Sequence, residues 1–448
     1  MNKTIILLVA VLTVGAQFPA SAEDRPNIIF LFADDQAYDT VGCYGNPDVK
    51  TPNMDRIGNS GLIFDRHYNT TAICMASRAN VMTGLLEYRT GCNFMHGPMA
   101  KSIWNKSFPV QLRSAGYRTA FGGKFGFAVV EDPRLGGNDN KYENLPVNDF
   151  DLWVGGLGQT HYQTAKNKYL APYAEKYPHS SRAYGAAGVE FITESAKTEK
   201  PFCLTLFFKA PHRPTTPDPE FDDVYRETTF RKLPNYGREA GQHLAPQSKM
   251  GRQYPRFEEW GYHTEASYQA ALRTYNQQIY AIDVAVGMLL DTLEAHGLVD
   301  NTVIIYSSDN GFFNGSHGLG SKVLPYEEGA RVPLMIYDPR VPKEQRGRRT
   351  DSVSGNIDIA ATIMDLAGIS KLDTLDGKSL MPLVRGEAER VRERLPLIQV
   401  WGTAGTLALG VVTEQYKYIY WCYGEGMDPR EELFDIQFDP FEMRDLAS

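Results

Sequence analysis

The sequence has few cysteines, no excess of positive charge and, beyond its N-terminal stretch, no long uninterrupted apolar run. Its 448 residues include 5 cysteines, and such a small, odd number in a long chain excludes a disulfide scaffold. The formal net charge of -8 excludes a broadly basic surface for nucleic acid, although cations gathered in one cleft can still bind an anion. Because no later segment is apolar over the length of a bilayer, we expect no membrane span.

The apolar run that is present lies at the N-terminus. Lys3 precedes the run from Ile5 to Val14, and the small residues Ala20-Ser21-Ala22 follow. This order is typical of a secretory signal peptide, here residues 1–22. The first cysteine is Cys43, too far along for a lipid anchor directly after the run. We therefore expect an exported protein, periplasmic or extracellular.

Apolar strand-like runs alternate with helical patterns through most of the chain, and there is no internal repeat. This alternation predicts an α/β fold with a large mixed, mainly parallel sheet flanked by helices. The predicted helices are Ser77 to Thr83 and Tyr268 to His296. The predicted strands are Asn27 to Ala33, Arg118 to Gly122, Phe202 to Phe208, Val303 to Ser308 and Pro333 to Tyr337.

The pattern changes from about Leu395 onward. Ala408 to Thr413 and Tyr416 to Tyr423 have the composition of a strand hairpin, and Glu432 to Ile436 follows as a further strand. We therefore expect a main domain of residues 23–385 and a smaller C-terminal subdomain of residues 386–448 with an antiparallel sheet.

Charged and amide side chains stand at the ends of four predicted strands: Asp34 and Asp35, Lys124, His212, and Asp309 and Asn310. In open α/β sheets, ligands bind beyond the carboxyl ends of the strands, so these residues should share one site. The two acidic groups offer only oxygen ligands, which favours a hard cation such as calcium or magnesium over zinc. Of these we expect calcium.

Each of these residues also has an interpretation without function. An aspartate after a strand is often a turn former or a helix N-cap. A single lysine or histidine is more often a surface cation or a hydrogen-bonded core residue. The recurrence of such residues at several strand ends favours a site.

The most specific segment is Cys74-Met75-Ala76-Ser77-Arg78. From the residues alone, Cys74 is either a reactive thiol near a helix N-terminus beside Arg78 or a buried or disulfide-bonded cysteine. The segment resembles the signature of the type I, formylglycine-dependent sulfatases of the alkaline phosphatase-like superfamily. That signature consists of a cysteine, two further residues, a serine and an arginine. The cysteine is oxidised to formylglycine (3-oxoalanine).

The resemblance covers nearly the whole mature chain, with residues 23–385 as the sulfatase catalytic domain, and it implies roles for the strand-end residues. It implies a calcium site made by Asp34, Asp35, Cys74, Asp309 and Asn310. It implies the catalytic residues Cys74, Arg78, Lys124, His212 and Lys322, of which Lys124, His212 and Lys322 bind the substrate. Lys322 precedes Tyr326, Glu327 and Arg331-Val332-Pro333, like the downstream lysine block of the family.

The implied reaction is hydrolysis of a sulfate monoester. Metal and lysines neutralise the sulfuryl oxygens, hydrated formylglycine from Cys74 attacks sulfur, and a general acid such as His212 protonates the leaving oxygen. The implied partners are a formylglycine-generating maturation enzyme and a sulfated polysaccharide or oligosaccharide. Aromatic residues of the middle stretch suit stacking on sugars, although they also suit packing: Trp153, Tyr162, Tyr173, Tyr184, Tyr225, Tyr254, Trp260 and Tyr262. Arg213 and His263 are further candidate substrate contacts.

Two positions depart from the family pattern. Ala76 stands where proline is usual, which resembles a variant accepted by some bacterial maturation enzymes. Gly126 stands where members often have a histidine that supports the formylglycine diol. Either another histidine takes that role, with His96, His161 and His317 as candidates, or regeneration works differently.

Two other functions stay open. Related enzymes with the same metal and formylglycine layout hydrolyse phosphodiesters or phosphonate monoesters. If Cys74 is not matured, the protein is instead a non-catalytic binder of sulfated glycans.

Overall fold

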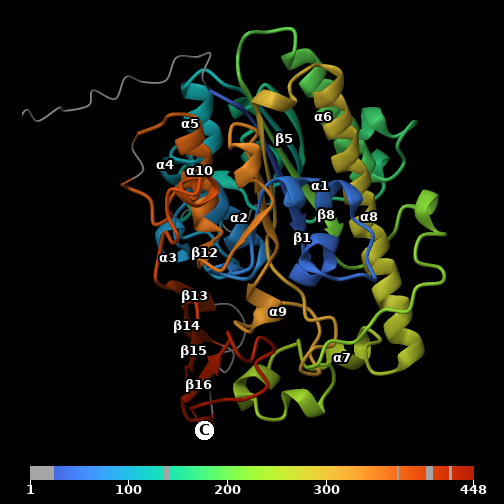
Figure 1. Cartoon of the computed structure of the whole chain (residues 1–448), viewed down its shortest axis with the longest axis vertical. Helices are drawn as coiled ribbons and strands as arrows, with labels where there is room; N and C mark the ends of the chain where they lie inside the picture. The colour runs from blue at the N-terminus through green and yellow to red at the C-terminus, as the bar shows by residue number, and fades with distance from the viewer. Residues whose placement is uncertain (1–24, 135–140, 371–372, 400–406, 423–425, 448) are drawn as a thin grey trace, which may run out of the picture.

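A computed structural model describes residues 25–134, 141–370, 373–399, 407–422 and 426–447 (Figure 1), so the predicted signal peptide lies outside the described residues. Its main sheet has eight strands: β1 (Asn27–Asp34), β2 (Leu62–Phe64), β5 (Arg118–Lys124), β7 (Leu152–Gly156), β8 (Phe202–Pro211), β9 (Thr302–Ser308), β10 (Leu334–Tyr337) and β11 (Arg348–Thr350). Their order is β11-β2-β10-β9-β1-β8-β5-β7. From β9 to β7 the strands run parallel, whereas β10 is antiparallel to both neighbours. The predicted mixed, mainly parallel sheet is confirmed.

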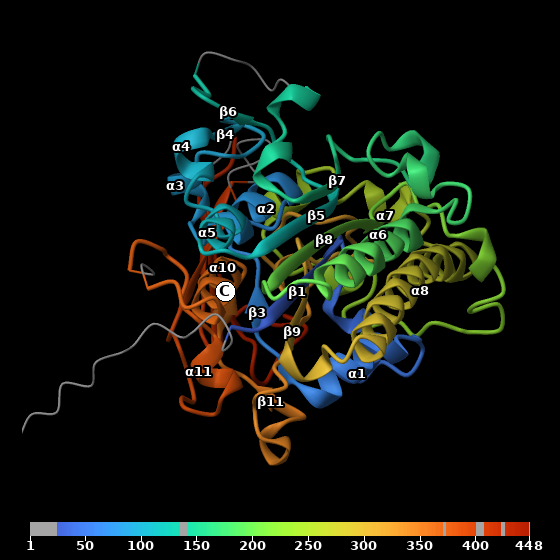
Figure 2. The same ribbon diagram turned by 90° about the horizontal axis from the view of Figure 1, so that it is seen from above.

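Helices cover both faces of this sheet (Figure 2). On one side lie α6 (Ser180–Ser195) and α8 (Glu265–Ala295), and on the other lie α2 (Cys74–Thr83), α5 (Phe108–Ser114) and α10 (Ile357–Leu366). Every residue of β1 and β8 is buried, as expected for strands covered on both faces. Alternate residues of β1 pack into the two hydrophobic cores on either side of the sheet. Ile29 and Leu31 belong to one core, and Phe30 and Phe32 belong to the other. The continuous apolar runs of the sequence therefore become the centre of the sheet.

The predicted strands of the main domain correspond to β1, β5, β8, β9 and β10, with small differences at their ends. The predicted long helix is α8, and the side chain of its N-cap Thr264 accepts a hydrogen bond from the Ser267 backbone N–H. The other predicted helix is α2, but it begins at Cys74 rather than Ser77. Cys74 therefore occupies the first turn of a helix. Within the described residues, no helix has both the length and the apolar character needed to cross a membrane.

The C-terminal region forms a second, four-stranded antiparallel sheet, as predicted (lower left in Figure 1). Its strands are β13 (Leu395–Gln399), β14 (Ala408–Val412), β15 (Tyr416–Trp421) and β16 (Arg430–Asp435), in that order. The first of these was not among the predicted strands. Tyr423, the predicted end of β15, lies outside the described residues, and the domain boundary between residues 385 and 386 stays a prediction.

A buried ion-pair cluster joins this sheet to the main domain. Lys417 of β15 is fully buried, with Nζ 2.6 Å from Glu327 Oε1 and 3.0 Å from Glu442 Oε1. Glu327 begins the short helix α9 (Glu327–Ala330), which closely follows Lys322 in the chain. Because removing one partner of a buried ion pair leaves an uncompensated charge, this contact fixes the C-terminal sheet against the segment that carries Lys322.

Candidate active site

The site lies at the carboxyl ends of four neighbouring strands. Asp34 ends β1 and Lys124 ends β5, while His212 directly follows β8 and Asp309 directly follows β9. The four strands are adjacent in the order β9-β1-β8-β5, so their ends meet at one edge. The structure therefore brings together the residues that the sequence placed at separate strand ends.

Four oxygen-bearing side chains gather at this edge. The Asp35 backbone N–H donates to Asp309 Oδ1 over 3.1 Å, and Asn310 Nδ2 donates to Asp35 Oδ1 over 2.6 Å. Within the described residues, Asp34 Oδ1 and Asn310 Oδ1 are buried and have no hydrogen-bond partner. Buried polar atoms without partners are costly, and they fit a cation that takes oxygen ligands. One possible ligand atom from each of Asp34, Asp35 and His212 lies within 4.8 Å of the others.

Three buried cations neutralise these carboxylates. Lys124 Nζ lies 2.6 Å from Asp34 Oδ2, and Lys322 Nζ donates to Asp35 Oδ1. Arg78 places Nε 2.9 Å and Nη2 2.8 Å from Asp309 Oδ2, and its Nη1 donates to the Lys124 carbonyl over 2.6 Å. Arg78 is fully buried, and neither Arg78 nor Lys124 is among the residues that line the cavity described below. This geometry favours a positioning role for Arg78, holding Asp309 and Lys124.

Burial and charge act on these groups in opposite directions. Burial opposes ionisation of Asp34, yet Lys124, His212 and Arg78 hold its pKa well below the usual range. Burial, followed by the Asp34 charge, raises the pKa of Asp309 to about 7. Burial lowers the pKa of Lys322, but its carboxylate neighbours outweigh this and raise it overall. The edge is therefore a compact set of opposite charges with Asp34 ionised.

Cys74 lies where this charged edge opens into a cavity of about 570 Å³. It is the first residue of α2, and the N-cap residue Ile73 provides no side-chain hydrogen bond to the helix. Uncapped N–H groups at a helix N-terminus favour a nearby anion. The residues that line the cavity include Asp35, Cys74, Gln159, His212, Arg213, Arg252, Arg256, Trp260 and Lys322.

The signature helix is fixed by polar contacts behind Cys74. Ser77 Oγ donates to Asn69 Oδ1 over 3.0 Å and accepts from Asn356 Nδ2 over 3.1 Å. Asn356 Oδ1 in turn accepts from Thr70 Oγ1 over 3.0 Å. These contacts explain why the signature needs a serine three residues after the cysteine, since that hydroxyl joins α2 to two other segments.

The segment that carries Lys322 has unusual backbone geometry. Ser321 and Val323, on either side of the lysine, have φ values of 77° and 92°, and Asp35 has a φ of 71°. A β-branched residue such as Val323 rarely adopts this left-handed conformation, and each such residue costs about 1–3 kcal/mol. The strain falls on residues that position the site, as is common at functional sites.

Several basic residues in or near the cavity were missed by the sequence interpretation. Lys209 ends the apolar run of β8, and its Nζ donates to the Gln159 carbonyl over 2.9 Å. Burial lowers the pKa of Lys209 to about 8. A lysine within an apolar strand was a usable signal. Arg252 and Arg256 come from a region without clear periodicity, so the sequence provided no signal that they reach the cavity.

The candidate substrate contacts and the candidate replacement histidines differ in position. Arg213 lines the cavity, whereas His263 is exposed and does not. His96 and His161 are also exposed and do not line the cavity, and His317 is buried 3.7 Å from Glu328. None of these three histidines is therefore placed to take the role of the absent family histidine. Of the eight candidate aromatics, Trp260 lines the cavity.

The backbone at Gly126 shows why no histidine fits there. Gly126 has a φ of 96°, and a Cβ at this position would lie 2.6 Å from Arg78 Cδ. Any larger side chain must therefore displace Arg78, which holds Asp309 and Lys124. The glycine at position 126 and the tight packing of Arg78 therefore depend on each other, because Arg78 occupies the space that a side chain at this position would need.

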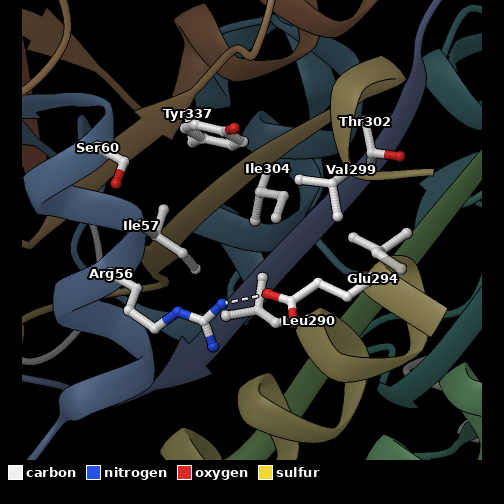
Figure 3. Close-up of a pocket in the computed structure, with 10 residues that line it drawn as sticks. Arg56, Ile57, Ser60, Leu290, Glu294, Val299, Thr302, Ile304 and Tyr337 are labelled. Atoms are coloured by element: carbon white, nitrogen blue, oxygen red, sulfur yellow. Dashed lines mark hydrogen bonds and ion pairs between the residues drawn. The ribbon is translucent and has the colours of Figure 1, made fainter. Parts of the chain in front are cut away.

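A smaller pocket of about 110 Å³ lies at the opposite end of the sheet (Figure 3). It is lined by Thr302, the first residue of β9, whereas Asp309 follows the last. Its wall combines apolar and polar side chains, and the Arg56–Glu294 ion pair crosses it at 2.5 Å. Because its lining residues include neither Cys74 nor any of the strand-end carboxylates, this pocket is not the active site.

A sheet of this topology, with oxygen ligands, cations and a cysteine in the first turn of a helix at its carboxyl edge, defines a hydrolase of the alkaline phosphatase-like superfamily. The family model for sulfatases matches residues 26–369, so the chain belongs to the sulfatase family and is a sulfuric ester hydrolase. The model for the C-terminal region of N-sulphoglucosamine sulphohydrolase matches residues 315–448.

Similar proteins span nearly the whole chain. It is 27% identical to the N-acetylglucosamine-6-O-sulfatase of Bacteroides thetaiotaomicron, over 99% of this chain and 87% of that one. It is 29% identical to the human N-acetylglucosamine-6-sulfatase, over 86% and 69% of the two chains. A solved structure in complex with its substrate D-glucosamine-2-N,6-O-disulfate has a TM-score of 0.74 and 26% identity, covering 95% and 94%. The phosphonate monoester hydrolase of Agrobacterium radiobacter has a TM-score of 0.75, 21% identity and coverage of 94% and 92%, which shows a common fold.

We expect Gly126→Ala to lower kcat/KM on an aryl sulfate by about 10²-fold, because a displacement of Arg78 shifts Asp309 and Lys124. The matched control is Gly45→Ala, since Gly45 has a similar φ of 94° but nothing within 4 Å of the added Cβ. Both variants carry the cost of a left-handed alanine, about 1–2 kcal/mol, which thermal melting measures. Equal activity losses in the two variants would contradict a specific contact with Arg78.

Proposed function

We propose that this protein is an exported sulfatase that removes sulfate from a sulfated oligosaccharide or polysaccharide, using a formylglycine made from Cys74 and a bound calcium ion. The observation that carries the proposal is the position of Cys74, on the first turn of α2 and in one cavity with Asp35, His212 and Lys322. Relatives that act on N-acetylglucosamine sulfates and on a glucosamine disulfate favour an amino sugar. Export rests on the pattern in residues 1–22.

The proposed calcium is held by side-chain oxygens of Asp34, Asp35, Asp309 and Asn310. The buried Oδ1 atoms of Asp34 and Asn310, which lack hydrogen-bond partners, support this ligand set. An oxygen on the converted Cys74 side chain would complete it. When bound, the ion neutralises charge on the sulfuryl oxygens.

The protein's own cations bind and orient the ester. Lys124 and Lys322, which reach Asp34 and Asp35, donate to sulfuryl oxygens at the same edge of the sheet. Arg78 keeps Lys124 and Asp309 in place through two hydrogen bonds and an ion pair. The maturation enzyme that converts Cys74 is the partner implied by the signature.

His212 is the proposed general acid. Its Nδ1 lies 2.5 Å from the Arg213 carbonyl, an acceptor, so Nδ1 carries a proton and Nε2 is left for exchange with the leaving oxygen. Burial lowers the pKa of His212 to about 4. A bound anionic ester raises this pKa again, because a nearby negative charge favours the protonated ring.

The second candidate is hydrolysis of phosphodiesters or phosphonate monoesters, supported by a solved hydrolase of that kind with the same fold. Rates on paired aryl sulfate and aryl phosphate esters separate the two. A faster phosphate reaction would replace the sulfatase proposal for this site.

In active protein, the Cys74 peptide should show loss of sulfur and gain of oxygen by mass spectrometry, and it should react with carbonyl reagents. Cys74→Ala should be folded and inactive, as measured by circular dichroism and aryl sulfate turnover. Active enzyme that carries only unmodified Cys74 would falsify the proposed nucleophile. A folded wild-type protein that binds sulfated glycan without conversion of Cys74 would instead be a binding protein.

Removal of divalent cations should abolish activity, and calcium should restore it better than zinc, because the ligands are all oxygen atoms. Calcium should also raise the melting temperature of the wild-type protein, since an ion that binds only the folded state stabilises it by mass action. Asp309→Ala should lose this calcium-dependent shift. Full activity in a sample shown to be metal-free by elemental analysis contradicts the metal proposal.

His212→Ala should lose roughly 10²–10⁴-fold in rate on a sulfated sugar and much less on an activated aryl sulfate, because a sugar alkoxide needs a proton to leave. Lys124→Ala and Lys322→Ala should depress both rates by similar factors, because the sulfuryl charge they meet does not depend on the leaving group. Steady-state rates on both substrates measure this. Equal losses for His212→Ala would make it a sulfate-binding residue and leave Lys322 as the candidate acid.

A further inference from the structure

One wall of the active-site cavity carries three arginines that the mechanism above does not use. Arg213 directly follows His212, while Arg252 and Arg256 come from the segment that leads into α7 (Arg256–Glu259). In Figure 1, α7 lies in the lower part of the view, between α8 and the C-terminal sheet. All three arginines line the same cavity as Cys74.

The ring of Trp260 contacts two of these arginines. The guanidinium carbon of Arg213 lies 4.7 Å from the centre of the Trp260 ring, and that of Arg256 lies 4.4 Å from it. Arg256 Nη1 also donates to Ser321 Oγ over 2.8 Å, next to Lys322. Contacts with an aromatic face hold a guanidinium in place without neutralising its charge. Two of the arginines are therefore fixed and still able to bind an anion.

The positive charges of Arg213 and Arg256 have different surroundings from those of the two site lysines. Among the described residues, neither Arg213 nor Arg256 takes part in an ion pair, in contrast to Lys124 and Lys322, which contact Asp34 and Asp35. Burial, followed by the positive charge of Arg252, lowers the pKa of Arg256 to about 10. The positive charges of Arg252 and Arg256 repel each other, and a bound anion relieves that repulsion.

We propose that Arg213, Arg252, Arg256 and Trp260 form a second anion subsite, which binds an anionic group of the substrate other than the ester being cut. The preferred substrate is then a sugar with at least two anionic groups, a second sulfate or a carboxylate beside the scissile sulfate. This inference rests on the proposed sulfatase function and narrows its substrate class. Its residues differ from those proposed to bind the scissile sulfate, which are Lys124, Lys322 and His212.

The test compares D-glucosamine 6-sulfate with D-glucosamine-2-N,6-O-disulfate in wild-type enzyme and in Arg213→Gln and Arg256→Gln. The wild-type enzyme should have the higher kcat/KM on the disulfated sugar. Each variant should lower that preference by roughly 10- to 100-fold, as expected for loss of a charge-assisted hydrogen bond, mainly through KM. Arg256→Lys, which keeps the charge, should retain part of the preference.

The control is Arg226→Gln, because Arg226 is an exposed arginine with 64% side-chain exposure and is not among the residues that line the cavity. Its substrate preference should equal that of the wild type. Losses of the same size on both sugars in Arg213→Gln and Arg256→Gln would overturn the second subsite and assign these arginines to the scissile sulfate. A wild-type enzyme without preference between the two sugars would also overturn it.

Calorimetry with the Cys74→Ala protein separates this inference from the proposed function. An arginine-dependent preference for the disulfated sugar in binding supports the subsite even if no sulfate ester is turned over. Loss of turnover on every sulfate ester, together with such binding, overturns the sulfatase proposal alone. Turnover of aryl sulfate without any arginine-dependent preference in binding overturns the subsite alone.

Discussion

The rest of the structure depends on the burial of three aspartates at one edge of a sheet. Asp34, Asp35 and Asp309 are between 0% and 3% exposed, and carboxylates this deep are tolerated only when cations or hydrogen bonds compensate them. Lys124, Lys322 and Arg78 provide that compensation from three different segments. The same requirement accounts for the tight packing around Arg78, and it is the basis on which a divalent ion is proposed. Structure and chemistry at this edge therefore have one electrostatic origin.

The C-terminal sheet supports this edge indirectly, through a buried ion-pair cluster. Lys417 contacts both Glu327 and Glu442 in the interior, and Glu327 closely follows the strained segment around Lys322. Left-handed residues persist where the surrounding packing over-determines the backbone. The antiparallel sheet therefore serves to hold the segment that places the Lys322 ammonium group against Asp35.

The strand-end residues could be predicted from the sequence because two simple rules combine there. A continuous apolar run identifies a buried strand, and parallel strands bring their carboxyl ends to one edge, so Asp34 and Asp309 had to be close. Arg252 and Arg256 could not be predicted, since they follow no periodicity and reach the cavity through the path of an irregular segment. The first turn of α2 was also missed, because the N-cap position before Cys74 is occupied by Ile73, which is not one of the residue types that mark a helix start.

The aromatic residues show most clearly how the cavity differs from the expectation of sugar stacking. Tyr184 and Trp153 lie in the two hydrophobic cores, and the Tyr162 hydroxyl donates to the His212 carbonyl over 2.6 Å. Trp260 lines the cavity, but two guanidinium groups approach its ring. An aromatic face engaged by cations offers less surface to a sugar and places positive charge where the sugar would stack. At Trp260 the cavity therefore offers positive charge more than a stacking surface, as the proposed second anion subsite requires.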